Sequence, residues 1–326
     1  MSQISVYLNP HASKSLHHFQ AEEIKKYFFR QDIIFYSPNT QEELLSRISE
    51  DRKKGVECVF SIGGDGTANL IAQNLIGSKT KLLVLAGGTA NDFATELGTN
   101  SNIKKLANIY HAKTTKEVDI LKVNDRYLIT NGGIGIGQNV ASEINSLRKE
   151  NSMFKSLLKG LGKNTYTLVL IKNILMKKFE LQEVYISSPD YPLLEKRVKT
   201  GLLLINNQPM LAGKYPVAPE TRNDDGKFNV TIFLHDNKIS FAKSAMSFLQ
   251  GKYPENDPNI ISFETNELNM TSIDDKELKF FGDGEIFAPS KELNISLIPK
   301  GLNVFTDDRE FNLCSSHSLD IIPRIQ

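Results

Sequence analysis

The sequence has few of the residues that mark several classes of protein. None of its 326 residues is tryptophan, and only two, Cys58 and Cys314, are cysteine. Two cysteines this far apart are too few for a disulfide framework or a cysteine zinc site, which fits a reducing cytoplasm. The first residues show no charged and then apolar leader, and no apolar run approaches the roughly 18 residues of a membrane-spanning helix. We therefore expect a soluble, cytoplasmic protein that at most lies on the inner face of a membrane.

The chain also lacks an excess of either charge. Lys and Arg number 39 and Asp and Glu 38, so the formal net charge is +1. This balance excludes a uniformly basic nucleic-acid-binding protein and an acidic disordered tail. Positive charge is nevertheless concentrated between Arg148 and Lys178, where Glu150 is the only acid among many lysines. Such a segment fits peripheral contact with an anionic lipid surface and equally a packing helix with a solvated lysine face, and the sequence leaves both open.

The length predicts two domains, and the first of them has an alternating pattern of strands and helices. Segment Thr40–Lys53 begins with Thr40 and has Glu43 three residues later, which is the signature of a helix N-terminus. Alternation of this kind predicts an open, mostly parallel α/β sheet with helices on both faces. The predicted buried strands are Ile4–Leu8, Ile33–Tyr36, Cys58–Ile62 and Leu82–Leu85.

After about Leu128 the pattern changes to short strand candidates separated by turn residues. This predicts a mostly antiparallel β-sandwich with one helix near Ile239–Leu249. We therefore expect an α/β domain at 1–128, a β-rich domain at 129–303, and a C-terminal segment 304–326 that packs back on the first. The predicted strands are Val184–Ser187, Gly201–Ile205, Phe228–Leu234, Ile260–Glu264, Leu268–Thr271, Lys279–Phe281 and Leu293–Ile298, with turns at Asn223–Gly226, Asp274–Asp275 and Pro299–Gly301.

Glycine-rich loops follow the predicted strands of the first domain. Gly63-Gly64-Asp65-Gly66-Thr67 lies between the strand ending at Ile62 and a helical pattern, and a helix N-terminus with glycines is a natural seat for phosphate. A second loop, Ala86–Ala94, repeats this arrangement, and Asn9–Lys14 follows the first strand. Loops at the carboxyl ends of neighbouring parallel strands meet at one edge of a sheet, so we predict a nucleotide site there. By contrast, Gly132–Gly137 lacks a following βαβ context, and we expect a close-packed turn.

Several motifs together resemble the diacylglycerol kinase catalytic-domain family of lipid kinases, which includes sphingosine and ceramide kinases. They occur in the family's order over nearly the whole chain. The overall layout resembles that of the soluble bacterial members, and the implied fold is the one shared with NAD kinase. The motifs are Gly63–Thr67, Gly88–Ala94, Glu117–Ile120 before Tyr127–Asn131, Asn206-Asn207 through Gly213, Pro219 through Gly226, and Gly282-Asp283-Gly284-Glu285.

The resemblance implies an enzyme that transfers the γ-phosphate of ATP to a lipid hydroxyl with Mg²⁺, diacylglycerol being the leading acceptor. Asp283 and Glu285 are the implied catalytic carboxylates. Asp65, Asp92 and Asp119 resemble an acidic set linked to the site through water and magnesium. Asp225, through its carboxylate, and Arg222 and Lys227, through their carbonyls, resemble a magnesium loop, which suits an oxygen-preferring cation. The implied ATP-binding residues are Asn9, Pro10, Ser13, Gly63, Gly64, Asp65, Gly66, Thr67, Asn69 and Thr89.

Two positions depart from the family pattern. Leu70 stands where the family usually has an acid, and Lys14 stands where it usually has glycine. Leu70 keeps open a catalytically weak protein that binds lipid or nucleotide. The sequence also leaves open a kinase of sphingosine, ceramide or phosphatidylglycerol, and a kinase of a soluble acceptor like NAD kinase, which shares the Gly-Gly-Asp-Gly-Thr motif. An exposed strand edge is compatible with a homodimer, and we expect no nucleic-acid partner.

Overall fold

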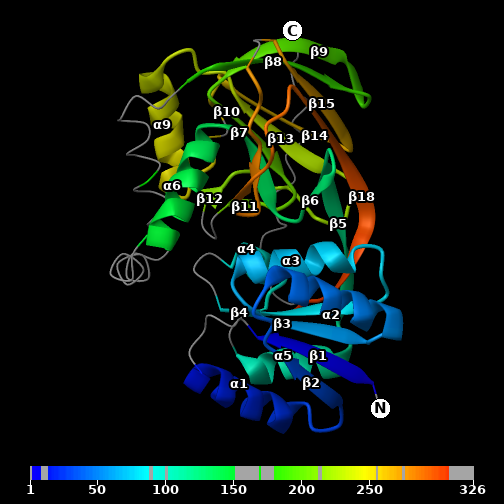
Figure 1. Cartoon of the computed structure of the whole chain (residues 1–326). Helices are drawn as coiled ribbons and strands as arrows, with labels where there is room; N and C mark the ends of the chain where they lie inside the picture. Colours follow the sequence, from blue (N-terminus) through cyan, green and yellow to red (C-terminus); the bar gives the residue numbers. More distant parts are fainter. Residues whose placement is uncertain are drawn as a thin grey trace. The chain divides into compact units, whose positions relative to one another are not determined.

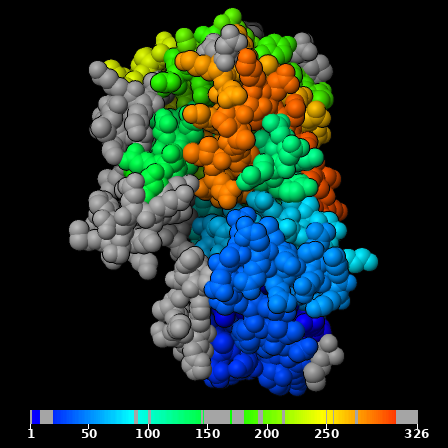
Figure 2. All heavy atoms as spheres, in the orientation of Figure 1, coloured from blue at the N-terminus to red at the C-terminus, as the bar shows by residue number. Residues whose placement is uncertain are grey.

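The structure, a computed structural model, describes residues 2–8, 14–87, 91–99, 102–150, 169, 180–211, 215–254, 256–273 and 276–307. Its contacts divide the chain into two units: unit 1 is Met1–Val118 with Lys300–Gln326, and unit 2 is Asp119–Pro299. Strands β5 (Thr115–Val123) and β18 (Glu292–Phe305) run from one unit into the other. Figure 1 labels the elements, and Figure 2 shows the atoms of unit 1 mostly in blue to cyan and those of unit 2 mostly in green to orange.

Unit 1 is built on a parallel sheet in the order β2-β1-β3-β4. Helices α2 and α3 cover one face of this sheet and α1 and α5 the other (Figure 1). The predicted α/β domain is therefore confirmed. Its elements are β1 (Gln3–Leu8), α1 (Lys14–Tyr27), β2 (Asp32–Tyr36), α2 (Gln41–Lys54), β3 (Cys58–Gly63), α3 (Asp65–Leu75), β4 (Lys81–Ala86), α4 (Asp92–Glu96) and α5 (Ile103–Ala112).

Helix α2 begins where the sequence predicted. The hydroxyl of Thr40 accepts a hydrogen bond from the N–H of Glu43 at 3.1 Å, and Gly55 ends the helix with a φ of 67°. The carboxylate of Glu43 accepts from the N–H of Asn39 at 2.9 Å, one residue before the cap. Apolar side chains on the inner face, such as Leu44 and Ile48, are buried and fix the helix on the sheet.

The end of β18 joins unit 1. Val304 pairs with Leu82 of β4 in parallel, and the N–H of Thr306 donates to the carbonyl of Thr114 at 3.1 Å. Asp307 forms an ion pair with Lys105 at 3.1 Å. These contacts attach residues 304–307 to the sheet of unit 1, and residues 308–326 lie outside the described residues.

Unit 2 is a sandwich of antiparallel strands around one core. One sheet has the order β14-β13-β10-β7-β16-β17, and the other includes β18-β15-β8-β9 together with the hairpin β5–β6. Their inner faces share a core cluster that includes Ile134 and Ile205 from the first and Ile186 and Ile295 from the second. This confirms the predicted sandwich. The strands are β6 (Arg126–Leu128), β7 (Asn131–Gly135), β8 (Gln182–Ser188), β9 (Tyr191–Thr200), β10 (Leu202–Asn206), β11 (Met210–Leu211), β12 (Tyr215–Pro216), β13 (Phe228–Phe233), β14 (Ile260–Thr265), β15 (Glu267–Ser272), β16 (Phe281–Gly282) and β17 (Glu285–Ile286).

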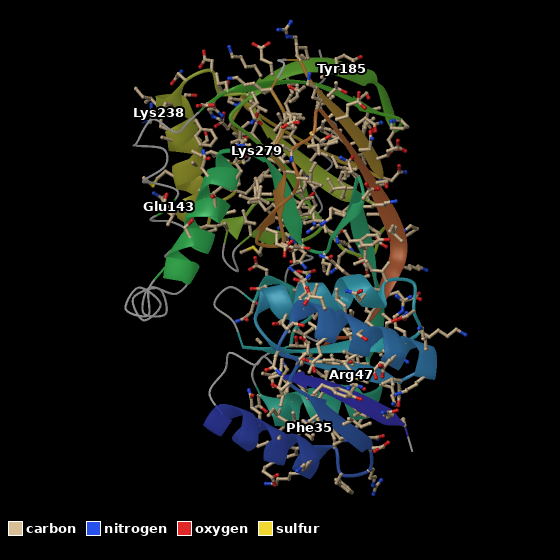
Figure 3. All side chains as sticks on the ribbon, in the orientation of Figure 1. Phe35, Arg47, Glu143, Tyr185, Lys238 and Lys279 are labelled. Atoms are coloured by element: carbon tan, nitrogen blue, oxygen red, sulfur yellow. The ribbon has the colours of Figure 1, made fainter. Side chains whose placement is uncertain are left out.

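Two helices of unit 2 pack against the outer face of the first sheet. A second cluster joins Ile136 of α6 (Ile136–Glu150), Phe241 of α9 (Lys238–Leu249) and Phe233 of β13. Figure 3 labels Glu143 on α6 and Lys238 at the start of α9. In the part of the chain that the structure describes, no helix is long and apolar enough to span a membrane.

Three details of the predicted fold are wrong. Gly132–Gly137 is not a turn, because it forms most of the central strand β7 and the start of α6. Pro299–Gly301 does not end a strand: β18 continues through it, with a left-handed φ of 52° at Lys300. The expected strand Lys279–Phe281 is reduced to Phe281–Gly282, and Leu278 instead forms an isolated bridge with Ser290.

Candidate active site

The first glycine loop joins β3 to the N-terminus of α3. Gly63 ends the strand, and Gly64 caps the helix with extended backbone angles of −88° and −178°. The carbonyl of Gly64 accepts from the N–H of Thr67 at 3.1 Å, whereas the N–H of Gly66 has no partner among the described residues. A Cβ placed on Gly66 would have no described atom within 4 Å beyond its chain neighbours and its own helix. An N–H donor and open space at a helix N-terminus are what a phosphate requires.

The second loop contacts the first. The N–H of Gly87 donates to the carbonyl of Gly63 at 2.8 Å, and a Cβ on Gly87 would lie 3.1 Å from the same oxygen. Asp65 also joins the loops, because its Oδ2 accepts the N–H of Asn91 at 2.8 Å. Asn91 has a left-handed φ of 54° and is followed by Asp92, the first residue of α4. The structure thus brings Asp65 beside the loop that carries Asp92, at the carboxyl ends of β3 and β4.

Of the other predicted ATP-binding residues of unit 1, the structure describes Asn69 and not the rest. Asn69 is buried, 4% exposed, on α3. Asn9, Pro10, Ser13 and Thr89 lie outside the described residues, as does nearly all of the basic segment after 150. The predicted ATP-binding set is therefore described from Gly63 to Asn69.

The acidic turn of unit 2 holds its two carboxylates differently. Asp283 has a left-handed φ of 51°. Its Oδ2 accepts the N–H of Ile129 at 2.8 Å, and its Oδ1 accepts the N–H and hydroxyl of Thr130 at 2.9 and 2.6 Å. The side chain of Glu285 is 63% exposed and pairs with Arg126 at 2.8 Å. Asp283 is thus fixed through both of its carboxylate oxygens by one short segment, whereas Glu285 is reached by solvent.

Asp119 is the anchor of the predicted magnesium loop. It is 1% exposed, and its N–H donates to the carbonyl of Asn223 at 2.6 Å. Its Oδ2 accepts the N–H of Gly226 at 2.8 Å. Gly226 has a φ of 80°, a conformation that glycine adopts without strain. The structure therefore brings Asp119 together with the loop that contains Arg222, Asp225 and Lys227.

Within this loop negative charge accumulates around Asp225. Arg222 is turned to Asp224, at 3.0 and 3.2 Å, and the Oδ1 of Asp225 accepts the N–H of Lys227 at 3.1 Å. Partial desolvation is the main cause that raises the pKa of Asp225, and the carboxylates of Asp119 and Asp224 raise it further.

Glu264 extends this acidic region and was not predicted from the sequence. Desolvation raises its pKa, and the nearby charges of Asp225 and Glu220 add to the effect. Among the described residues no three His, Cys, Asp or Glu side chains could hold a metal ion together. The predicted magnesium site is of another kind, with one carboxylate and two backbone carbonyls.

Sequence reasoning also missed Arg126 and Thr130, the partners of Glu285 and Asp283. Both lie in or beside the β5–β6 hairpin, more than 150 residues before the turn that they contact. Strand pairing of β16 with β7 brings them together, and no local sequence signal encodes that pairing.

The chain matches two family models in succession. Residues 3–123 match the diacylglycerol kinase catalytic domain, and residues 156–306 match the YegS C-terminal NAD kinase beta sandwich-like domain. Among its relatives is a "Probable lipid kinase YegS-like" of Enterobacter sp. The two sequences are 28% identical over an alignment that covers 78% of this chain and 80% of the relative. A "Diacylglycerol kinase" of Bacillus subtilis is 24% identical over 73% of this chain and 75% of the relative.

The fold is also that of a solved structure. The crystal structure of a putative diacylglycerol kinase from Bacillus anthracis superposes with a TM-score of 0.75 at 20% identity, covering 94% of this chain and 98% of the other. The family models account for both units, and the family's reaction is ATP-dependent phosphoryl transfer. The chain belongs to the diacylglycerol kinase catalytic domain family and is similar to YegS-like bacterial lipid kinases.

Proposed function

We propose that this protein phosphorylates a lipid hydroxyl with ATP and Mg²⁺, and that diacylglycerol is the acceptor. The observation that carries the proposal is the phosphate cradle at the start of α3, where Gly66 offers open space and an N–H without a partner among the described residues. The name of the Bacillus subtilis relative supports diacylglycerol as the acceptor. Sphingosine, ceramide and phosphatidylglycerol are the competing acceptors that an assay must separate.

The phosphates of ATP bind at the glycine loops in this proposal. The helix dipole and the N–H groups of the first turn of α3 neutralise phosphate oxygens, and the hydroxyl of Thr67 donates to one of them. Asn9, Pro10, Ser13, Asn69 and Thr89 complete the ATP site. Phosphoryl transfer depends mainly on holding the nucleotide and the acceptor hydroxyl in line, so this cradle supplies position as well as charge.

The acidic loop of unit 2 fits a magnesium ion. Asp225 offers a carboxylate whose pKa is raised by desolvation and by neighbouring carboxylates, so a cation there relieves repulsion. Arg222 and Lys227 would add carbonyl oxygens, which suits a hard cation. When bound, the ion would supply charge neutralisation, and Asp65, Asp92 and Asp119 are the further acids that the family resemblance links to it through water.

Glu285 is the better placed of the two candidate bases. Three hydrogen bonds from Ile129 and Thr130 already occupy both oxygens of Asp283, so they are less accessible to an acceptor hydroxyl than the exposed carboxylate of Glu285. Asp283 therefore orients the turn, and the exposed carboxylate of Glu285 accepts the proton of the lipid hydroxyl. Arg126 holds Glu285 in place before the acceptor binds.

Contact with the membrane is assigned to the basic segment 148–178. Its lysines would rest on anionic lipid and bring the enzyme to a substrate dissolved in the bilayer. Co-sedimentation with anionic vesicles that is lost with neutral vesicles or high salt is the expected result. Equal binding to neutral vesicles would assign the segment to packing instead.

A radiolabelled-ATP assay over a lipid panel, with NAD as a soluble acceptor, tests the activity. We expect magnesium-dependent product from diacylglycerol, and loss of at least about 100-fold of turnover in Glu285→Gln and Asp65→Asn. Both variants should fold, because Gln keeps an oxygen for Arg126 and Asn keeps an acceptor for the N–H of Asn91. Full turnover in either variant contradicts the assigned site. ATP binding without turnover of any acceptor would favour the weak binding protein that Leu70 suggests.

A further inference from the structure

A single buried side chain connects the two acidic groups of unit 2. Asn207 follows β10 and is 1% exposed. Its Nδ2 donates to the carbonyl of Asp119 at 2.9 Å and to the carbonyl of Ile129 at 3.0 Å. Its own N–H donates to Oδ1 of Asn131 at 3.0 Å, so the residue is held through its backbone as well. Asn207 therefore bridges the two arms of the β5–β6 hairpin at its open end, just beyond the pair of Leu121 with Leu128.

Each end of this bridge leads directly to a carboxylate. Asp119 receives the N–H of Gly226 on its side chain and fixes the loop that carries Asp225. Ile129 donates its own N–H to Asp283, and its carbonyl accepts from Asn207. The side-chain amide of Asn207 is thus linked to Asp283 by two successive hydrogen bonds through Ile129. It is linked to the loop of Asp225 by two successive hydrogen bonds through Asp119.

The neighbouring Asn206 offers a natural comparison. It is also fully buried, and its Nδ2 also makes two hydrogen bonds, to Oδ1 of Asn229 at 3.1 Å and to Oγ1 of Thr231 at 3.3 Å. Both partners lie on β13, beside Asn206 in the same sheet. These hydrogen bonds of the Asn206 side chain therefore stabilise the sheet and reach neither segment that holds an acidic group.

We propose that Asn207 is a positioning residue that sets the acidic turn of Asp283 against the loop of Asp119 and Asp225. This inference rests on the proposed function, in which the turn of Asp283 carries the base Glu285 and the loop of Asp225 holds magnesium. Removing the amide leaves two buried carbonyls without this donor and loosens the open end of the hairpin, from which Asp119 and Ile129 contact the loop of Asp225 and the turn of Asp283. A displacement of about 1 Å between reacting groups costs about 100-fold in rate.

The test compares Asn207→Ala with Asn206→Ala in the full chain. Both truncate a buried asparagine that donates twice, so we expect similar falls in the temperature of unfolding. Only Asn207→Ala should lose about 100-fold in kcat with little change in KM for ATP, because the ATP loops lie in unit 1. If Asn207→Ala fails to fold, Asn207→Leu serves as the second variant, because it keeps a similar volume and removes the donor without adding a buried charge.

A second readout does not depend on turnover. Saturating Mg²⁺ should raise the unfolding temperature of the native protein and of Asn206→Ala, and this rise should shrink in Asn207→Ala. Equal kcat and equal magnesium stabilisation in the two alanine variants would overturn the role of Asn207. If the native protein shows magnesium stabilisation but phosphorylates no acceptor, the proposed function fails while the magnesium comparison still tests the coupling. If Mg²⁺ stabilises none of the proteins, the proposed magnesium loop is wrong, and the coupling fails with it.

Discussion

Two glycine-rich segments of this chain look alike in sequence and have opposite surroundings. At Gly66, in the loop before α3, an added Cβ would have no described atom within 4 Å beyond its own helix and chain neighbours. At Gly133, in β7, an added Cβ would lie 2.0 Å from the carbonyl oxygen of Leu203. In the proposed function, the first segment is glycine-rich because the phosphates of ATP approach it. The second is glycine-rich because its own neighbours already occupy the space.

The crowding in β7 serves the acidic turn. Gly132 pairs with Gly282, and a Cβ on Gly132 would lie 2.5 Å from the carbonyl oxygen of Phe281. A Cβ on Gly282 would lie 2.4 Å from the side chain of Leu128. This close approach holds the turn of Asp283 beside the segment that donates to its carboxylate. Glycine therefore supports the site in both places, once by leaving room for a ligand and once by packing the protein against itself.

Gly133→Ala should have the largest effect and should act on folding. The methyl group cannot fit 2.0 Å from a backbone oxygen, and the backbone φ of 155° is one that alanine rarely adopts. We expect a loss of at least about 4 kcal/mol in the free energy of unfolding, enough to prevent unit 2 from folding. Soluble yield and denaturant unfolding measure it. Gly284→Ala is the matched control, because Gly284 also has a positive φ, of 80°, but its added Cβ would meet no described atom within 4 Å, so it should cost only about 1 kcal/mol.

Gly66→Ala should separate stability from activity. Alanine in place of glycine within a helix stabilises it by about 0.5–1 kcal/mol, and no described neighbour opposes the methyl group. The same methyl group stands where the phosphates of ATP are proposed to lie, so KM for ATP should rise by about tenfold, or about 1.4 kcal/mol of binding. Thermal unfolding and ATP titration of one protein preparation give both values. An unchanged KM would remove Gly66 from the phosphate cradle.

The sequence predicted the parts of this fold that local signals encode. Thr40 with Glu43 located the start of α2, and the apolar runs located β1, β3 and β4, since capping and burial are properties of neighbouring residues. The strand at Gly132–Gly137 could not be predicted, because its identity depends on partners near residues 203 and 281. In the same way β18 continues through Pro299, a residue that usually ends a strand, because the strand passes from one unit into the other.

The same distinction between local signals and tertiary contacts holds for the candidate site. Asp65, Asp119, Asp225, Asp283 and Glu285 all stand in motifs, and the sequence identified them as candidates. Their partners Thr130 and Asn207 also stand in motifs, but the motifs do not indicate that these two residues hold the acidic groups, because the contacts form only in the folded sheets. Motifs indicate which groups meet the substrate, and tertiary structure decides which residues hold those groups in place.

Gly87→Ala should have the smallest effect. The space around Gly87 is intermediate between the open surroundings of Gly66 and the crowded surroundings of Gly133. Its Cβ would lie 3.1 Å from the carbonyl oxygen of Gly63, a contact that a shift of a few tenths of an ångström relieves. We expect a loss of about 1 kcal/mol in the free energy of unfolding, as for an ordinary substitution, and a rise of roughly threefold in KM for ATP as the two loops move apart. The hydrogen bond from Gly87 to Gly63 links the loops, so stability and affinity should fall together. A fall in stability with an unchanged KM would show that the spacing of the loops does not set the ATP site, and would leave Gly66 as the position that does.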